Sequence, residues 1–496
     1  MFLNEAGGNF YGFPSNPISV YRTGDAWPVP KGPQAQRVPR EARPVCNHPI
    51  QAVWHTVGVQ VYKFLDSIEV KWSTVDPVRF AEEGGEAGPL YLWVGVDPRS
   101  LSLDGAKAAA VGCKRILADA QFPDVEIAFR ESIFARSIGP QLLDYTPSVD
   151  PTADLHTPHL EGTGALYLRE SSQSKRVFLL TARHVPLPLS AHLNKLYAYE
   201  DTSQPRHEAL ILGSNAYQYA LEAMTGKIRR ELILVDYYKM ELAALGEAVE
   251  GENTMGKLTE AEMTVTAVDE FHGKITNHWS TVSQRVLGYV VYAPPVSVST
   301  GPKKFKDWAL IDLYLDKIDW DGFKCNVIYL GNKIPADDFV LKMHPHPEGR
   351  SSFKFPIGGL LQVKEVVKEN EIRQPTQLDK NGEECLLVIK NGKSTGVTIG
   401  RGTGIESFIR EYDDYGIQST SMEVAVYSYS HTDGAFSASG DSGSIVVDGL
   451  GRIVGLLTGG TGAIDSTDVT YLTSYFWLEE RIKQAFPNSY LYPIKA

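Results

Sequence analysis

The chain has 496 residues, of which 43% are hydrophobic and 22% are charged, a composition typical of folded globular proteins rather than of disordered chains. It carries 60 acidic and 48 basic residues, a formal net charge of −12. It therefore lacks the basic surplus that nucleic-acid binding or attachment to an anionic membrane would favour. No apolar run approaches the ~18 residues that a membrane-spanning helix needs, so we expect no transmembrane segment. At roughly 150 residues per domain, the length predicts about three domains.

The start of the chain and its cysteines indicate the compartment. The first residues show no basic region followed by an apolar stretch, so we expect no secretory signal. A secreted protein of this size more often carries a disulfide framework. The four cysteines are widely separated and lack the CxxC spacing of a zinc site: Cys46, Cys113, Cys325 and Cys385. We therefore predict four free thiols and a reducing, cytoplasmic location.

Residues 1–50 are rich in proline and contain eight of the chain's 29 prolines. Proline is disfavoured in helix interiors and in central strands. Four prolines of this segment follow one another closely: Pro28, Pro30, Pro33 and Pro39. The segment is therefore predicted to be an extended arm or a disordered tail.

Residues 51–146 have the pattern of a small α/β domain. Residues 90–96 form an apolar run typical of a buried strand, residues 104–119 favour a helix, and residues 125–131 alternate like a second strand. A strand–helix–strand connection of this length usually makes the two strands parallel neighbours. The region shows no catalytic pattern, so we expect a packing or interaction domain.

The pattern of the sequence changes after a polar, proline-containing stretch at residues 146–163. Beyond it, short β-forming runs are separated by Gly, Asn and Asp, which is typical of a β-barrel or a β-sandwich. We therefore expect the main, β-rich domain in residues 160–486.

Residues 214–281 interrupt this β-rich pattern because they favour helix. Between Glu241 and Glu270 there are eight acidic residues and one lysine, Lys257, so the outer face should be strongly negative. We expect a solvated helical hairpin inserted into the β-rich domain. The alternative is a docking surface for a basic protein partner.

The sequence Gly440-Asp441-Ser442-Gly443 places a serine on a tight, glycine-flanked turn before an apolar strand. A nucleophilic serine needs this setting, because its hydroxyl must be exposed and nearby backbone N–H groups must be free to stabilise an oxyanion. Four residues alone are a weak signal. The assignment depends on a histidine and a carboxylate in comparable settings.

A histidine and a carboxylate do occur in such settings. His184 directly follows an apolar run and a Thr-Ala step, and Asp307 stands at the start of the apolar run 308–313. The chain order His, Asp, Ser is one of the known orders of a catalytic triad. Asp312 is the alternative carboxylate, but it lies inside the predicted strand rather than at its start.

These segments resemble the chymotrypsin/trypsin-like serine peptidases, a superfamily of double β-barrels. Thr181-Ala-Arg-His184 is similar to the family's Thr-Ala-Ala-His motif, and Asp307-Trp-Ala-Leu310 to its Asp-x-Ala-Leu motif. Gly440–Gly443 resembles the nucleophile motif, and Gly455–Gly460 the substrate-binding strand that follows it. The whole chain also resembles a group of fungal proteins that contain a trypsin-like peptidase domain.

The resemblance implies a trypsin-like double β-barrel, here with a helical insertion and an N-terminal α/β unit. It implies that His184 is the general base, Asp307 its orienting carboxylate and Ser442 the nucleophile. The backbone N–H groups of Gly440 and Ser442 would form the oxyanion hole. The expected activity is that of an intracellular serine endopeptidase acting on a peptide or protein substrate, without a metal or cofactor.

The resemblance also suggests a specificity pocket. Counting back six residues from Ser442 places Phe436 at the base of the pocket, where a trypsin-like enzyme would have an aspartate. A loop shorter or longer by one or two residues would move Phe436 into the core and bring Ser437 into the pocket. A buried cation without a carboxylate is costly, so we expect cleavage after small or medium apolar residues. The other expected lining residues are Thr458, Gly459 and Gly460.

Two further features need an explanation. The chain does not begin with the Ile-Val-Gly-Gly sequence whose free amino group would pair with Asp441, so Asp441 needs another partner.

The sequence His344-Pro-His346-Pro has two potential metal ligands, but proline places them in a loop with no acidic or cysteine companion. We therefore expect no metal there.

Two functional alternatives remain open. The first is a catalytically inactive barrel that serves as an interaction scaffold, with the acidic insertion as its contact surface. The second is a protease that processes only itself. Both would retain the fold, so the sequence does not distinguish them from an endopeptidase.

Overall fold

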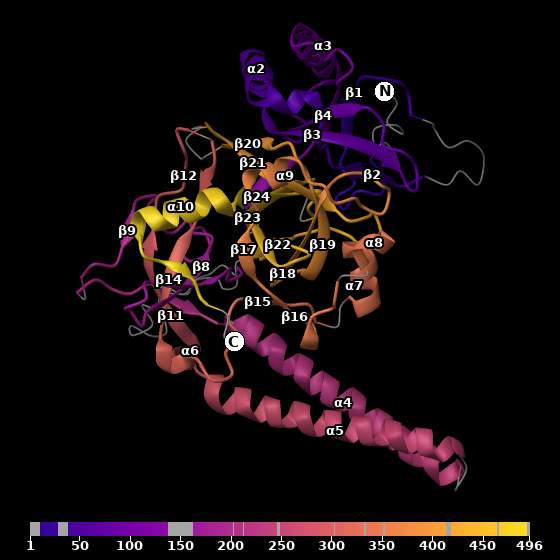
Figure 1. The fold of residues 1–496 in the computed structure, drawn as a ribbon, viewed down its shortest axis with the longest axis vertical. Helices are drawn as coiled ribbons and strands as arrows, with labels where there is room; N and C mark the ends of the chain where they lie inside the picture. The colour runs from indigo at the N-terminus through magenta and orange to yellow at the C-terminus, as the bar shows by residue number, and fades with distance from the viewer. Residues whose placement is uncertain are drawn as a thin grey trace. The chain divides into compact units, whose positions relative to one another are not determined.

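A computed structural model describes the fold over most of the chain, which divides into two compact units (Figure 1). The first unit lies within residues 1–140, 160–204 and 290–496, and the second within residues 141–159 and 205–289. The described residues are 10–27, 38–136, 162–201, 203–211, 213–245, 249–301, 303–331, 334–350, 353–412, 418–463 and 466–493.

The first unit contains a closed β-barrel. Six strands form a ring in which every neighbouring pair is antiparallel and the last strand returns to the first. Their sequences are rich in Val, Ile and Leu, which favour strands and fill the barrel interior. In ring order the strands are β18 (Leu386–Gly392), β19 (Gly396–Gly402), β21 (Gln418–Ser428), β24 (Val469–Ser474), β23 (Arg452–Gly462) and β22 (Ile445–Asp448).

Most of a second, open sheet lies in the same unit. In sheet order the strands are β11 (Val286–Ala293), β14 (Ala309–Leu313), β8 (Val177–Thr181), β7 (Tyr167–Arg169) and β25 (Tyr490–Leu491), with β9 (Tyr197–Ala198) paired to β11. Its strands β14, β8, β7 and β25 are antiparallel neighbours, and two of them carry the segments next to the predicted catalytic histidine and aspartate. Two short ribbons, β12–β13 (Ser297–Val298 and Phe305–Lys306) and β15–β16 (Val327–Tyr329 and Leu360–Gln362), stand apart from this sheet.

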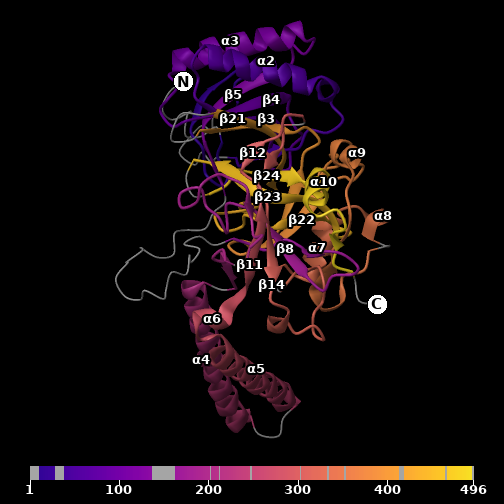
Figure 2. The same cartoon turned by 90° about the vertical axis from the view of Figure 1, so that its left-hand side faces the viewer.

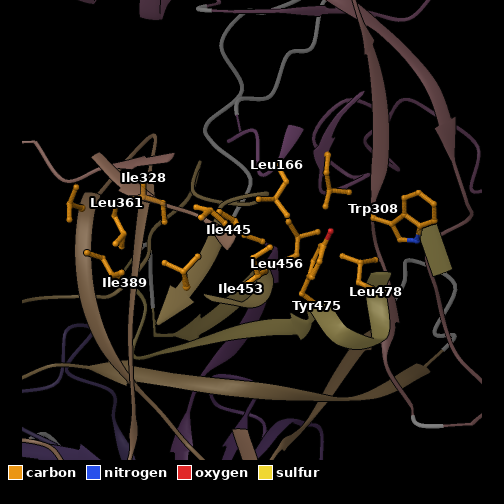
Figure 3. Close-up of a cluster of buried hydrophobic side chains, with 14 of the residues drawn as sticks. Leu166, Trp308, Ile328, Leu361, Ile389, Ile445, Ile453, Leu456, Tyr475 and Leu478 are labelled. Carbon is orange, nitrogen blue, oxygen red and sulfur yellow. The ribbon is translucent and has the colours of Figure 1, made fainter. Parts of the chain in front are cut away.

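One hydrophobic cluster joins the barrel to the open sheet (Figure 3). Leu166 and Trp308 come from the side of the open sheet, and Ile445 and Leu456 come from the barrel. The C-terminal helix α10 (Tyr475–Ala485) adds Tyr475 and Leu478 to the same cluster. Because these buried side chains pack together, the two sheets hold each other at a fixed distance.

The expected fold class is confirmed. The protein is mainly β with α additions, and a six-stranded barrel packed beside a second curved sheet is the trypsin-like arrangement. Within the described residues, the second sheet does not close into a ring.

The α/β region extends the barrel sheet. The predicted strand–helix–strand unit is present as β4 (Leu90–Val96), α3 (Leu103–Asp119) and β5 (Glu126–Glu131), and β4 and β5 are parallel neighbours as predicted. β4 also pairs with β3 (Trp72–Glu82), and β3 pairs with β20 (Ser407–Tyr412), the strand next to β21. Two helices, α2 (Trp54–Ser67) and α3, pack against each other beside these strands. This region is therefore attached to the barrel through a continuous sheet.

The described parts of residues 1–50 are ordered, so the alternative of a disordered tail is wrong for them. β1 (Ser19–Arg22) pairs with β5, and β2 (Arg40–Arg43) pairs with β3. Phe10 and Phe13 are buried, and the ring of Phe10 lies 5.1 Å from that of Trp93. Proline is tolerated beside such edge strands, and the buried aromatic rings stabilise the segment. Three of the clustered prolines, Pro28, Pro30 and Pro33, lie outside the described residues.

The second unit is built on two long helices that lie side by side, α4 (Ser214–Leu245) and α5 (Val249–Trp279) (Figures 1 and 2). A short helix α6 (Val282–Arg285) follows, and β10 (Glu208–Leu210) pairs with the start of β11. The buried contact between the long helices is small and is centred on Val235, Leu258 and Ala261. No helix in the described residues is both long enough and apolar enough to cross a membrane. The predicted basic partner of the acidic face and the predicted cytoplasmic location stay predictions.

Candidate active site

The register of two neighbouring strands brings His184 and Asp307 together. β8 and β14 are antiparallel, with Thr181 opposite Ala309, so the residues just after β8 meet those just before β14. His184 Nδ1 lies 2.6 Å from Asp307 Oδ2, and the His184 backbone N–H donates to Asp307 Oδ1 at 3.1 Å. The contact expected between the histidine and the aspartate is therefore present.

The alternative carboxylate, Asp312, lies at the other end of the same strand. It is opposite Phe178, and its Oδ2 accepts a hydrogen bond from Arg176 Nε at 2.9 Å. Asp312 is therefore paired with an arginine at the far end of β14, and Asp307 is the carboxylate that orients His184.

Asp307 is held in its ionised form by its surroundings. Burial alone would raise the pKa of its carboxyl, but His184, Arg136 and two hydrogen bonds from His184 together hold that pKa well below its usual range. An ionised Asp307 accepts the proton of Nδ1 and leaves Nε2 as the acceptor nitrogen of the imidazole. Arg136, whose Nη1 lies 3.5 Å from Asp307 Oδ2, was not expected from the sequence, where it is an ordinary arginine in a short alternating run.

Ser442 lies on the turn before β22 and is fully buried. Its Oγ donates to the backbone carbonyl of Thr458 at 3.3 Å. His184 Nε2 is also buried, and it has no hydrogen-bond partner in the part of the chain that the structure describes. The proton transfer expected from Ser442 to His184 requires the two side chains to be within hydrogen-bond reach, but they share no hydrogen bond here, and the hydroxyl donates to the β23 carbonyl instead.

The turn that carries Ser442 is nevertheless packed against the end of β8. Gly443 has a φ of +87°, and a Cβ there would lie 2.2 Å from Thr163 O and 3.2 Å from the backbone nitrogen of Ala182. Only glycine allows this close approach. The Thr163 backbone N–H also donates to Ser442 O at 2.8 Å. The nucleophile turn and the histidine loop are therefore in contact through their backbones.

The N–H groups of Gly440 and Ser442, the predicted oxyanion donors, make no hydrogen bond to the described part of the protein. Gly440 adopts a φ of +98°, and its carbonyl accepts a hydrogen bond from Thr163 Oγ1 at 3.3 Å. Two unsatisfied N–H groups on one turn are what an oxyanion hole requires.

A buried lysine supplies the partner that Asp441 needs. Lys390 Nζ lies 3.2 Å from Asp441 Oδ2, and both side chains are fully buried. The carboxylate also accepts hydrogen bonds from the backbone N–H groups of Ser394 and Ala438, at 2.8 and 3.0 Å. The ion pair therefore fixes the turn that carries Ser442. The sequence signal is a lysine that directly follows the apolar run 386–389 within a predicted strand, because such a lysine needs a buried anion.

The placement of Phe436 at the base of a specificity pocket is wrong. Phe436 is 2% exposed and packs in the barrel core with Val426, Val446 and Leu457. Counting six residues back from Ser442 therefore reaches a core position. Ser437, the second candidate, is also buried, and its Oγ lies 2.6 Å from Thr470 Oγ1.

The other expected pocket residues lie along β23. Thr458 contacts Ser442 through its carbonyl, and Thr470 is opposite Gly460 in the β23–β24 ladder. The Ser437 hydroxyl therefore contacts β24 at Thr470, the residue opposite Gly460. Gly459 and Gly460 also pair, on the other side of β23, with the short strand β6 (Ile133–Arg136).

The two histidines considered as metal ligands have separate surroundings. The His344 ring lies 4.4 Å from the Phe353 ring, and His346 Nε2 lies 3.0 Å from the Asp379 carbonyl. The described residues contain no group of three or more His, Cys, Asp or Glu side chains that could hold a metal. All four cysteines are present as free thiols.

The chain matches no family model and no curated protein. Among solved structures it is similar to a glutamic acid-specific serine protease that uses a histidine triad in substrate binding, with 13% identity and a TM-score of 0.22. The match covers 42% of this chain and 82% of that chain. A likeness this distant carries no argument about chemistry and gives no support to the fungal group.

Proposed function

We propose that the protein is a serine endopeptidase that cleaves peptide bonds through His184, Asp307 and Ser442. The observation that carries the proposal is the state of His184. Its Nδ1 is held by a buried, ionised carboxylate, while its buried Nε2 has no hydrogen-bond partner among the described residues. The end of β8, just before His184, contacts the serine turn. A buried polar nitrogen without a hydrogen bond is costly, and a catalytic role is one reason for a protein to keep it.

In the proposed reaction, Ser442 Oγ rotates from the Thr458 carbonyl toward His184 Nε2. Nε2 takes the hydroxyl proton while Oγ attacks the substrate carbonyl carbon, and Asp307 stabilises the imidazolium that forms. The N–H groups of Gly440 and Ser442 donate to the oxyanion. His184 then gives its proton to the leaving amine, and water hydrolyses the acyl-enzyme by the reverse sequence.

We also propose that the residue before the cleaved bond is small and uncharged. The Ser437 and Thr470 hydroxyls beside Gly460 offer hydrogen bonds but no charge, so a buried lysine or arginine side chain would lack a counter-ion there. A peptide-library cleavage profile tests this specificity.

A small fluorophosphonate probe tests the proposed function, because it reacts with a serine only when a neighbouring base activates it. We expect covalent labelling of the wild-type chain and none of Ser442→Ala. Ser439→Ala is the matched control, since Ser439 is an exposed serine on the same loop, and it should be labelled like the wild type. Equal labelling of Ser442→Ala and wild type would contradict the proposal.

An inactive scaffold is the second candidate, and one observation favours it. Ser442 Oγ is bonded to Thr458 and not to His184, an arrangement that a barrel without catalytic function could retain. The same probe decides between the two, since an inactive barrel would not be labelled. Self-processing is distinguished from cleavage of other proteins by comparing the intact mass of the wild type with that of Ser442→Ala.

A further inference from the structure

The edge of β23 beyond Thr458 is the place where an extended peptide would bind next to Ser442. One side of β23 pairs with β24 from Gly455 to Thr461. The other side pairs with β22, but that pairing ends at Leu456. From Gly459 onward this side offers backbone groups to an added strand, directly beside the carbonyl that contacts Ser442. Extended peptides bind proteins by adding a strand to such an edge.

The chain itself occupies this edge with β6. The strand is antiparallel to β23, with Ile133 opposite Gly462 and Arg136 opposite Gly459. Its chain direction therefore runs toward Thr458 and the Ser442 turn. A substrate that lies antiparallel to β23 with its reacting carbonyl at Ser442 would need the same backbone partners and the same direction.

Phe134 is the first of two side chains that anchor β6. The Phe134 ring is stacked on Phe305, with centroids 6.3 Å apart, and lies 6.1 Å from the Tyr471 ring. A Cβ on Gly459 would come within 2.7 Å of both the Phe134 ring and the Ala135 carbonyl, so β6 and β23 are closely packed. These contacts come from three separate parts of the chain and hold the strand in place.

Arg136 connects β6 to the catalytic carboxylate. Its Nη1 lies 3.5 Å from Asp307 Oδ2, while Nε and Nη2 donate to Glu411 at 2.8 and 2.6 Å. A cation beside Asp307 reduces the ability of that carboxylate to stabilise an imidazolium at His184. The position of β6 therefore opposes catalysis in two ways, by occupying the edge and by placing a charge at the triad.

The burial of the catalytic side chains agrees with a closed state. Ser442 is 0% exposed and His184 is 1% exposed. A peptide must reach Ser442 along the β23 edge, so a peptide substrate cannot react until β6 moves, whereas the small fluorophosphonate does not need that edge.

We propose that β6 is an intramolecular inhibitory strand. It fills the substrate-binding edge of β23, and a peptide substrate gains access only when β6 leaves. This inference rests on the proposed peptidase function and adds its regulation: the enzyme is held inactive toward peptide substrates by its own segment Ile133–Arg136. The proposal predicts that weakening the anchors of β6 accelerates reactions that need the β23 edge.

The experiment compares two covalent probes on three forms of the full chain. One probe is the small fluorophosphonate, and the other is a tripeptidyl phosphonate with small apolar residues, which needs the β23 edge. Phe134→Ala removes the main anchor without touching Asp307. Ile133→Ala is the matched control, because Ile133 is in the same strand but 48% exposed. We expect the tripeptidyl probe to label Phe134→Ala about tenfold faster than either other form.

Each outcome decides a separate point. Equal tripeptidyl labelling of the wild type, Ile133→Ala and Phe134→Ala overturns the inhibitory role, even where the small probe labels all three. Absence of labelling by both probes in every form overturns the proposed peptidase function and this inference with it. Thermal melting shows whether Phe134→Ala folds. If it does not, Glu411→Gln weakens the second anchor at a partly exposed site and should accelerate tripeptidyl labelling in the same direction.

Discussion

In the proposed reaction, the position of the proton on His184 decides whether Ser442 can act as a nucleophile. Asp307 holds His184 through two contacts. Its Oδ2 lies 2.6 Å from the imidazole Nδ1, and its Oδ1 accepts a hydrogen bond from the His184 backbone N–H at 3.1 Å. Because Asp307 is ionised, it accepts from Nδ1–H and leaves a lone pair on Nε2. The tautomer thus follows from the ionisation of a buried acid.

Asp307→Asn tests this proton placement. The asparagine amide can donate to Nδ1, which moves the imidazole proton to Nε2 and removes the base. We expect fluorophosphonate labelling to slow by about 10³–10⁴-fold while the fold is retained. Asp312→Asn is the control and should label at the wild-type rate. A wild-type rate in Asp307→Asn would show that this carboxylate does not orient the base.

Lys390 and Asp441 are a second pair on which the site depends. Both side chains are fully buried. Removing one of them leaves the charge of the other without a counter-ion and without contact to solvent. Breaking a buried ion pair in this way typically costs about 3–5 kcal/mol. The pair therefore contributes to the stability of the barrel and to the conformation of the nucleophile turn.

Lys390→Met should lower the free energy of unfolding by about 3–5 kcal/mol in urea denaturation. Adding Asp441→Asn should recover part of the loss, because the unpaired carboxylate is removed. Lys364→Met, at an exposed lysine of β17 (Lys364–Val366), should change stability by less than about 0.5 kcal/mol. A loss that is the same in the single and the double variant would mean that Lys390 acts without Asp441.

At the scale of elements, the site is assembled from ends of strands that are far apart in sequence. His184 follows β8, Asp307 precedes β14 and Ser442 precedes β22. The β8–β14 register aligns the first two, and the contact of the Ser442 turn with the end of β8 adds the third. β23 then connects the site to β6 through consecutive residues of one strand.

Features with a local signal could be predicted from the sequence. The glycine-flanked serine, the histidine after an apolar run and the aspartate before one lie where their patterns placed them, next to β22, β8 and β14. The strand–helix–strand unit of β4, α3 and β5 was likewise predicted, because apolar runs and helical periodicity are properties of contiguous residues.

Features that depend on distant pairing could not be predicted. Phe436 was misplaced because counting back from Ser442 assumes a loop length that the sequence alone does not show. Lys390 and Asp441 are 51 residues apart, and nothing local links them. β6 has only four residues, and its partner strand begins more than 300 positions later, so its role depends on tertiary pairing.

At the scale of the whole molecule, the α/β region and the barrel belong to one unit. Their strands share a sheet through β3, β20 and β21. Arg130 is fully buried between them, with Asp76 Oδ2 at 3.2 Å, Asp468 Oδ2 at 3.5 Å and the Trp93 ring 3.4 Å away. A guanidinium held by carboxylates from β3 and from the loop before β24 couples both parts. We therefore expect them to unfold together.

Glu423, on β21 inside this unit, should make its stability depend on pH. Burial raises the pKa of the carboxyl from its ordinary value of 4.5 to about 8, although Lys304 opposes the shift. Its Oε1 accepts a hydrogen bond from the Phe305 backbone N–H at 2.7 Å, two residues before Asp307. The folded state therefore keeps a proton that the unfolded state releases above pH 4.5.

The sign of the effect follows from this proton. Stability from Glu423 is fully present below pH 4.5 and is lost as the pH rises toward 8, at ~1.4 kcal/mol per pKa unit. Glu423→Gln keeps the shape of the protonated acid, so its unfolding free energy should fall less steeply between pH 5 and about 8. Some slope remains, since burial also raises the pKa values of Asp76 and Asp468.

Urea denaturation followed by tryptophan fluorescence measures the unfolding free energy of the first unit at each pH, because every tryptophan except Trp279 lies in that unit. Glu86→Gln, at an exposed site, should retain the wild-type slope, and an equally steep slope in Glu423→Gln would show that Glu423 does not hold the proton.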